Sequence, residues 1–346
     1  MPIRPILFAQ GFVTAATLWM LVAATSAQAS LLAGVDALKE WNLIVFNNAT
    51  SSSEVEGRTF IGGNLTGNSS NYNIKGAATS AAGNPGLTVV GNVEGNAKNL
   101  NNASGANIGG NLSTMVNLNG GTQTLNVGGS SVNQNLNGST LNANLGSNFT
   151  STLQAQRDLL VSSLTSLSTN LKALTTTGTV STANNTLTIS AAAALNVFAV
   201  SSDDLNKVNQ ISVTTASGTT TVINVSGTNI LLNDNFLAAS SSLGENVIWN
   251  FYEATSISVT TAFYGTILAP YATVTLSNFV QGTLVASSLV QNGEVHLNTF
   301  QGDLSSVGGT VSAMPEPASW ALMIIGFGLA GAALRRRPHS VALLTR

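Results

Sequence analysis

Ile61-Gly62-Gly63-Asn64-Leu65 is the first copy of a short motif that decides the fold of this 346-residue chain. An aliphatic residue followed by Gly-Gly or Gly-Asn returns at Val90–Val93, Ile108–Leu112 and Val127–Gly129, after steps of 29, 18 and 19 residues. Short apolar runs that recur about every 18–20 residues, with Gly or Asn between them, are typical of β-solenoid coils. In such coils we expect Gly and Asn to supply the positive φ angles of the corners.

A second set of repeats lies later in the chain. Gly265-Thr266-Ile267-Leu268-Ala269 is echoed by Gly282-Thr283-Leu284-Val285-Ala286, 17 residues on. Aliphatic and polar residues alternate in Ala272–Leu276, which is typical of a strand with one buried side. The sequence therefore predicts a mainly β fold, a β-solenoid of the right-handed β-helix type. An ordinary β-sandwich with loose internal similarity is the alternative.

One long amphipathic helix is predicted between the two sets of repeats, over about residues 151–175. Ser151 with Gln154 matches a capping box, and Gly178 follows the expected end. A single apolar stripe is formed by Leu153, Leu160, Leu164, Leu167, Leu171 and Leu174. We expect this helix to pack alongside its own β domain, with a coiled-coil partner as the alternative.

Charged residues make up only 8% of the chain, far below the roughly 25% usual in soluble domains. The net charge is −2, and no basic cluster precedes the last residues, which argues against nucleic-acid binding. With 44% hydrophobic residues the chain is too apolar to be disordered. It has no cysteine, which excludes disulfides and thiolate chemistry. We expect a folded body with a surface of neutral amides and hydroxyls.

The first 29 residues have the pattern of a secretory signal peptide. Arg4 gives a weakly positive start, and Ile6–Ala24 is mostly apolar. Ala27 and Ala29 then occupy the −3 and −1 positions of a cleavage site before Ser30. We expect a mature chain that begins near Ser30, with a β domain over about 30–310. A retained membrane anchor is the alternative.

The end of the chain has the pattern of a membrane anchor. Residues 318–334 carry no charge, and at about 1.5 Å per residue a helix of this length reaches roughly 25 Å, the short end for crossing a bilayer. Arg335, Arg336 and Arg337 would hold the following end in the cytoplasm. The sequence predicts a transmembrane helix here, and a buried core helix is the alternative.

Residues 315–337 resemble the PEP-CTERM sorting signal of Gram-negative bacteria, and the positions that carry the resemblance are Pro315, Glu316, Pro317, Trp320, Arg335, Arg336 and Arg337. The resemblance implies an inner-membrane precursor that is processed by an exosortase-type enzyme. It then implies display at the cell surface or release outside the cell. It also implies an association with exopolysaccharide and biofilm.

The body carries a second resemblance, at both of its ends. Trp41–Phe46, Ser53–Arg58 and Ile61–Asn64 resemble the opening of the choice-of-anchor A domain, and Val247–Phe251 and Gly265–Ala272 resemble its closing part. Together they bracket about residues 34–305. The resemblance implies an exported, surface-displayed protein and no defined chemistry.

Few residues qualify for a catalytic or metal site, and we predict no cofactor. His296 is the one histidine before the tail, and a surface-facing strand position explains it better than a Ser–His–acid site. Asp203-Asp204 fits either a weak calcium site or a helix cap. Glu56 and Arg58 are possible ligand contacts, because Arg58 suits an acidic sugar or an exposed carboxylate. An internal Glu56–Arg58 pair or a solenoid cap is the alternative.

These observations predict a non-enzymatic, exported structural or binding protein associated with an exopolysaccharide matrix. An adhesin or ice-binding surface protein is one alternative, through the threonines of Thr219–Thr221 and Thr273–Thr275. A polysaccharide-acting enzyme on a solenoid scaffold is a weaker one.

Overall fold

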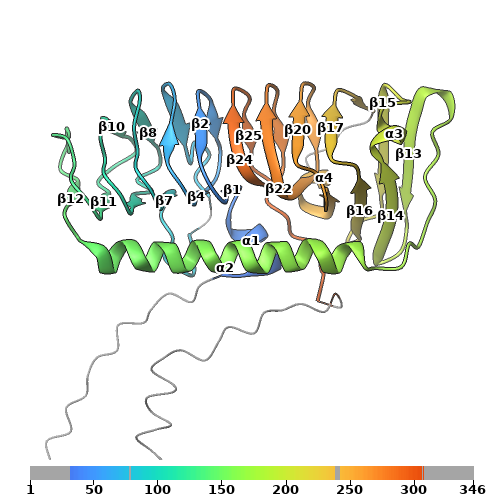
Figure 1. Cartoon of the computed structure of the whole chain (residues 1–346), viewed down its shortest axis with the longest axis horizontal. Coiled ribbons are helices and arrows are strands. Elements are labelled where there is room, and N and C mark those ends of the chain that lie inside the picture. Colours follow the sequence, from blue (N-terminus) through green and yellow to red (C-terminus); the bar gives the residue numbers. More distant parts are fainter. Residues whose placement is uncertain (1–31, 78, 238–241, 306, 308–346) are drawn as a thin grey trace, which may run out of the picture.

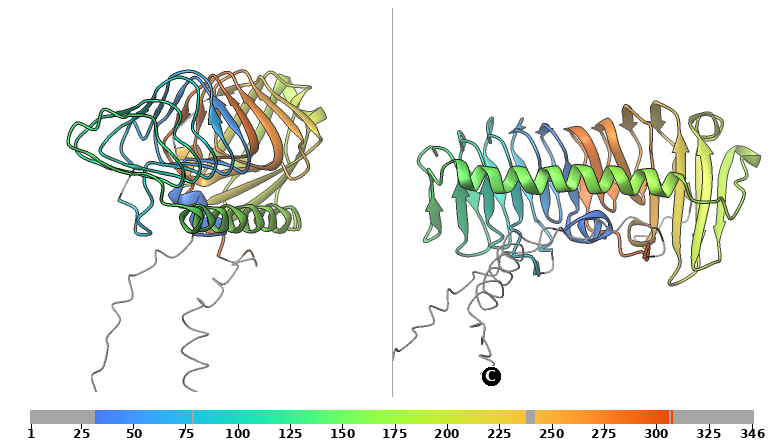
Figure 2. Two further views of the ribbon diagram at one scale, coloured as in Figure 1. Left: turned by 60° about the vertical axis from the view of Figure 1, so that its left-hand side comes forward. Right: turned by 60° about the horizontal axis from the view of Figure 1, so that its bottom comes forward.

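The computed structural model describes residues 32–77, 79–237, 242–305 and 307. All pairs of named strands are parallel. They stack side by side along one long axis as successive coils (Figure 1), and an oblique view shows the coils wound one behind another (Figure 2, left). The predicted mainly β fold is confirmed, and parallel pairing does not fit an ordinary β-sandwich, whose sheets are antiparallel.

The strands form sheets of 15, 7 and 3 members. The main path of the largest sheet runs through β12 (Thr140–Asn142), β11 (Thr124–Val127), β9 (Ala106–Ile108), β7 (Leu87–Val89), β4 (Thr59–Ile61), β1 (Leu43–Val45), β24 (Leu284–Gln291), β22 (Thr266–Leu276), β19 (Val247–Asn250), β16 (Thr220–Ser226) and β14 (Leu195–Ser201). Beside this path lie β2 (Ala49–Ser51), β5 (Leu65–Thr66), β17 (Asn229–Leu232) and β20 (Ser256–Val259).

The seven-stranded sheet consists of β10 (Val116–Leu118), β8 (Lys98–Leu100), β6 (Ser70–Tyr72), β3 (Glu54–Val55), β25 (Val295–His296), β23 (Val280–Gln281) and β21 (Phe263–Tyr264). The smallest sheet consists of β13 (Thr186–Ala191), β15 (Gln210–Thr215) and β18 (Asn235–Leu237). The helices are α1 (Gly34–Glu40), α2 (Ser147–Lys172), the 3-10 turn η1 (Ala183–Asn185), α3 (Ser202–Leu205) and α4 (Ser242–Asn246).

The coils do not stack in the order of the sequence. β1 lies in the middle of the stack, between β4 and β24, with Leu43 paired to Leu284. From β1 the coils proceed to β12 at one end, α2 returns along the stack, and the later coils run from β14 back to β24 (Figure 1). The first and last coils therefore meet at a seam, which the sequence did not predict.

Helix α2 lies along nearly the whole stack (Figures 1 and 2). Its 26 residues span about 39 Å, which matches the roughly 38 Å of eight strand spacings from β11 to β16. Side-chain bonds tie it to successive coils: Thr150 Oγ1 donates to Gly109 O (2.6 Å), Arg157 Nε to Phe46 O (2.8 Å), and Asn224 Nδ2 to Leu171 O (2.8 Å). The predicted packing of the helix alongside the β domain is confirmed.

The predicted helix boundaries need a correction. The helix begins at Ser147, after Gly146 at φ 81°, and ends at Lys172. The capping box proposed at Ser151 is therefore wrong, because Ser151 lies inside the helix. The leucine stripe is correct: five of its members are buried, and Leu174 packs against the same core.

The Gly-Gly-Asn corners are close contacts, not positive-φ turns. None of their glycines has a positive φ, so the expectation is wrong for this motif, whereas it is confirmed at other corners of the coils such as Gly67, Gly95 and Gly105. A Cβ at Gly63 or Gly110 would collide with Oδ1 of the asparagine in the preceding coil, Asn48 or Asn92. Each such oxygen accepts the backbone N–H of the next coil at 2.8–2.9 Å, at Asn64, Asn92, Asn111 and Ser130. The second glycine of the motif is thus needed to admit this asparagine ladder.

Three predicted segments lie outside the described residues: the signal peptide (1–29), the sorting signal (315–337) and the transmembrane helix (318–334). Within the described part of the chain, no helix is both long and apolar enough to span a bilayer.

Candidate functional site

The outer surface of the seven-stranded sheet, which we call the amide face, carries polar side chains in register. One row follows the strand pairing and contains Asn117, Asn99, Asn71, Glu54, Glu294 and Phe279. A second row, two residues further along each strand, contains Asn119, Asn101, Asn73, Glu56, His296 and Gln281. Inward residues of the same strands, among them Val55, Tyr72 and Val295, are buried in the core.

Hydrogen bonds between coils fix these side chains. Asn117 Nδ2 donates to Asn99 Oδ1 (2.6 Å), and Asn119 Nδ2 donates to Asn101 Oδ1 (3.1 Å). Asn71 Nδ2 donates to Glu54 Oε1 (3.0 Å). A carboxamide has two N–H donors and an oxygen with two lone pairs, so one ladder bond leaves further capacity for a ligand. Apart from the buried Asn73 and Glu56, the rows therefore present ordered donors and acceptors at the strand spacing.

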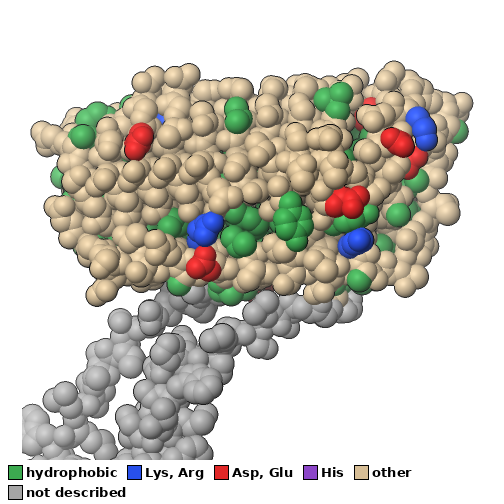
Figure 3. Space-filling view, viewed as in Figure 1, with side chains coloured by type: hydrophobic (Ala, Val, Ile, Leu, Met, Phe, Trp, Pro, Cys, Tyr) green, Lys and Arg blue, Asp and Glu red, His purple; other side chains and the backbone are tan. Residues whose placement is uncertain are grey.

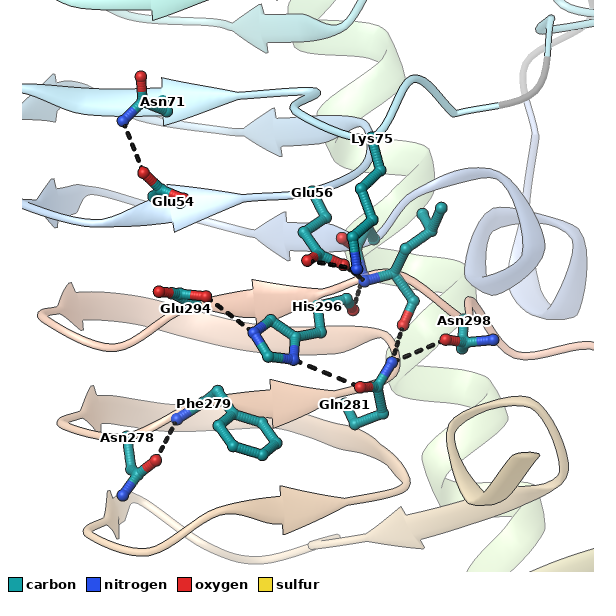
Figure 4. Close-up of polar contacts among 12 residues, drawn as sticks. Glu54, Glu56, Asn71, Lys75, Asn278, Phe279, Gln281, Glu294, His296 and Asn298 are labelled. Carbon is teal, nitrogen blue, oxygen red and sulfur yellow. Dashed lines mark hydrogen bonds and ion pairs between the residues drawn. The ribbon is translucent and has the colours of Figure 1, made fainter. Parts of the chain in front are cut away.

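His296 forms the centre of a cluster on this face (Figure 4). Its Nε2 lies 2.8 Å from Glu294 Oε2 and its Nδ1 lies 3.3 Å from Gln281 Oε1. The imidazole stacks on Phe279, with ring centroids 4.5 Å apart and an interplanar angle of 14°. The surface-facing strand position predicted for His296 is confirmed. Both ring nitrogens are occupied by an acid and an amide, which leaves no position for a serine nucleophile.

Glu56 and Arg58 are both 8% exposed and take part in contacts within the chain. Glu56 Oε1 lies 2.8 Å from Lys75 Nζ, and its Oε2 accepts the N–H of Leu297 at 2.7 Å (Figure 4). Arg58 Nε lies 3.5 Å from Glu40 Oε1 and donates to Asn84 O at 3.2 Å. Burial lowers the pKa of Arg58, and Glu40 partly opposes this shift. Ligand contact by Glu56 or Arg58 stays a prediction.

Arg58 also lines a pocket of about 270 Å³. The pocket lies beside the long connection between β6 and β7, where one coil is larger than its neighbours. Its wall is polar and includes Asn73, Asn84, Asn102 and Ser104. The sequence analysis identified Arg58 as a possible ligand contact, but it did not predict the pocket. The pocket forms only because the connection between β6 and β7 is longer than those of the neighbouring coils.

Asp203 and Asp204 are used at the start of α3. Ser201 Oγ accepts the N–H of Asp204 (3.1 Å), and Asp204 Oδ2 accepts the N–H of Ser201 (3.0 Å), which is a capping box. The hydrogen bonds from Ser201 lower the pKa of Asp204. Asp203 is exposed. The helix-cap alternative is confirmed, and the described residues contain no group of three or more His, Asp or Glu that could hold a metal.

A second regular surface, which we call the flat face, lies on the strands beside the main path. Its outward row contains Leu231, Ser258, Thr275, Val290, Thr50, Thr66, Glu94, Ser113 and Val132. In the view that includes β2, β17 and β20, charged side chains are few (Figure 3). The threonines of Thr219–Thr221 are buried, so their predicted place on an exposed face is wrong.

Comparisons with known proteins give one family match to the body of the chain. Residues 34–297 match the family described as a putative ice-binding-like adhesive domain. A similar solved structure is an ice-binding protein from the Antarctic ascomycete Antarctomyces psychrotrophicus, with 9% identity, a TM-score of 0.35, and coverage of 76% of this chain and 97% of that chain. Another is an ice-binding protein from an Antarctic bacterium, Flavobacteriaceae, with 12% identity, a TM-score of 0.27, and coverage of 74% and 79%. A search of curated proteins found no match.

Residues 315–337 match the PEP-CTERM protein-sorting motif, which confirms that prediction and implies export to the cell surface or the extracellular space. The choice-of-anchor A resemblance covers nearly the same span as the adhesive-domain match, and that name stays a prediction. The family match covers most of the chain, so the protein belongs to the family of putative ice-binding-like adhesive domains.

Proposed function

We propose that this protein is a non-enzymatic, surface-displayed binding protein that holds hydroxyl-rich polymers, in particular exopolysaccharide of the surrounding matrix, along its amide face. The observation that carries this proposal is the register of Asn, Glu, Gln and His side chains across six of the seven parallel strands, from β10 to β23. The sorting motif and the adhesive-domain family support a location where such a polymer is present.

The chemistry of the amide face suits neutral sugars. Amides and carboxylates exchange hydrogen bonds with hydroxyl groups, and the stacked Phe279–His296 pair offers an aromatic surface for the apolar side of a sugar ring. Each hydrogen bond contributes only about 0.5–1.5 kcal/mol net, so affinity has to come from many bonds along one chain. A long polymer that lies across several strands meets this condition.

The membrane steps of this proposal rest on the ends of the chain. A signal peptide cleaved before Ser30 would export the chain, and the segment 318–334 would hold the precursor in the inner membrane. An exosortase-type enzyme would then process the motif at Pro315–Pro317. Intact-mass analysis of the extracellular fraction should find a chain that ends near Pro317, and substitution of these three residues should abolish it. A chain that keeps residues 318–346 in the extracellular fraction would contradict this step.

Polymer binding is tested with purified exopolysaccharide from the host and the full-length protein. Phe279→Ala and the pair Asn99→Ala with Asn117→Ala each should weaken binding by about tenfold, which corresponds to about 1.4 kcal/mol. Thr275→Ala, on the flat face, is the matched control and should bind as the unchanged protein does. Equal binding by all of these proteins would exclude the amide face.

Ice is a second candidate ligand, favoured by the exposed Ser, Thr and aliphatic row of the flat face. Thr50→Lys would place a charge in the middle of this row, while Asn99→Lys would place one on the amide face. If the flat face binds ice, Thr50→Lys alone should abolish recovery of the protein in a growing ice fraction. If the unchanged protein is not recovered with ice, this candidate fails.

A further inference from the structure

The two ends of the stack differ in how their outermost strands are completed. At the β14 end, Thr177 N donates to Val197 O (2.8 Å), and Thr177 Oγ1 accepts the N–H of Val197 (2.8 Å). Ser181 and Thr188 exchange two backbone bonds, of 2.8 and 3.2 Å, beside β13. The segment after α2 therefore covers this end.

The other end, at β12, is open. Thr140 N donates inward to Gln123 O (2.9 Å), so the N–H and C=O of the next residue, Leu141, point away from the sheet. No described strand pairs with β12 on that side. By contrast, backbone groups at the neighbouring edge strand β10 have hydrogen-bond partners on the side chain of Gln134. Its Oε1 accepts the N–H of Val116 (2.8 Å), and its Nε2 donates to Thr114 O (2.9 Å).

The open edge lacks the usual protection against pairing with another chain. Exposed edges in soluble proteins are commonly guarded by charged side chains, proline or a covering segment. No charged residue and no proline occurs between Lys98 and Arg157, a stretch that includes the whole end coil. Val132 and Leu145, in or beside that coil, are 42% and 41% exposed.

We infer that the β12 edge is a self-association surface and that its partner is a second copy of this chain. In a two-fold contact, a charged residue near the axis lies close to the same residue of the second copy, and the two like charges repel. An uncharged end coil avoids this repulsion and is therefore suited to such a contact. Two β12 strands related by a two-fold axis run antiparallel. The outward N–H and C=O of Leu141 then bond to those of Leu141 in the second copy, and Thr140 lies opposite Asn142. The covered β14 end stops further stacking, so the product is a dimer and not a filament.

This inference is independent of the polymer ligand, and it is tested by sedimentation velocity of the full-length chain in detergent over about a hundredfold range of concentration. Asn142→Lys would place two lysines at diagonal cross-strand positions about 7–8 Å apart across the axis, so that their ammonium groups repel each other within the Debye length at moderate salt. The variant should dimerise at least about tenfold more weakly, and high salt should restore part of the loss. Asn142→Gln is the neutral control and should dimerise like the unchanged chain.

A single-cysteine variant gives a second readout, because the chain has no cysteine of its own. Antiparallel hydrogen-bonded residues have Cα atoms about 5.5 Å apart, which permits a disulfide. Leu141→Cys should therefore form a disulfide-linked dimer under mild oxidation, while Leu231→Cys, on the flat face and more exposed than Leu141, should not. A chain that stays monomeric at all concentrations, an unaffected Asn142→Lys dimer, or open-ended oligomers would each overturn the inference.

Discussion

Asp234 is a buried acid whose carboxylate has no hydrogen-bond partner in the described part of the chain. Its side chain is 2% exposed, and neither carboxylate oxygen has a partner among the described residues. Burial raises the pKa of this carboxyl to about 6 from a usual 3.8. The folded protein therefore holds a proton between about pH 3.8 and 6 that the unfolded chain has lost, and stability falls as pH rises through this window.

Replacement of Asp234 by Asn should therefore stabilise the fold at neutral pH. The expected gain is about 1–2 kcal/mol at pH 7.5, where the charged carboxylate is buried, and close to zero near pH 2.5, where the carboxyl is protonated in both the folded and the unfolded state. Denaturant titration at the two pH values measures the difference. An equal effect of the substitution at both values would show that the carboxylate charge is not its cause.

Lys98 poses the opposite case. It is fully buried, its Nζ donates to Asn68 O (2.7 Å) and Gly67 O (3.4 Å), and burial lowers its pKa to about 8. The unfolded chain binds more protons between about pH 8 and 10.5, so the contribution of Lys98 to stability should improve as pH rises through that range. Lys98→Met removes this titration, and a comparison of both proteins at pH 7.5 and 10 isolates it. A stability difference that stays constant with pH would refute the prediction.

At the scale of elements, the corner of each coil joins a glycine to the asparagine of the preceding coil. Gly110→Ala should cost about 1–3 kcal/mol or more, because the new Cβ meets Asn92 Oδ1 and the backbone of Gly91. Asn92→Ala should also destabilise, since Asn111 N–H loses its acceptor. In the double variant the new Cβ no longer collides with the Asn92 side chain. The double variant should therefore lose less stability than the sum of the losses of the two single variants. Additive costs, measured by denaturant titration, would mean that the corner glycine does not serve the ladder.

The sequence predicted some elements well because their signals are local. The echo of Gly265–Ala269 in Gly282–Ala286 matches the observed register, in which Ile267 pairs with Leu284. The leucine stripe identified the buried side of α2. The corner at Gly218 has a positive φ, and the strands on its two sides, β15 and β16, belong to different sheets.

At the scale of the whole molecule, the seam between the first and last coils holds the stack together. Asn42 is fully buried there: its Nδ2 donates to Gly282 O and His296 O (both 2.9 Å), and its Oδ1 accepts the N–H of Gly57 (2.9 Å). One side chain thus joins coils that are some 240 residues apart in sequence. The spacing of the repeats predicts that coils form, but it does not predict which coils are neighbours in the stack. Neither the seam nor the His296 cluster next to it could therefore be predicted from the sequence.

Loss of the Asn42 side chain should weaken the seam. Asn42→Ala leaves buried backbone groups without partners and should cost about 2–4 kcal/mol in denaturant titration. Asn47→Ala, a partly exposed position near the same seam, is the matched control and should cost clearly less. Equal costs for both substitutions would show that the buried asparagine does not hold the seam.

The central claim, that the polymer lies on the amide face, is tested most directly by carbodiimide labelling of carboxylates with and without host exopolysaccharide, read by mass spectrometry. Glu54 and Glu294 lie on the amide face, and Glu94 lies on the flat face, so one experiment compares both surfaces. We expect bound polymer to protect Glu54 and Glu294 while Glu94 reacts as before. Protection of Glu94 with unchanged labelling of Glu54 and Glu294 would contradict it.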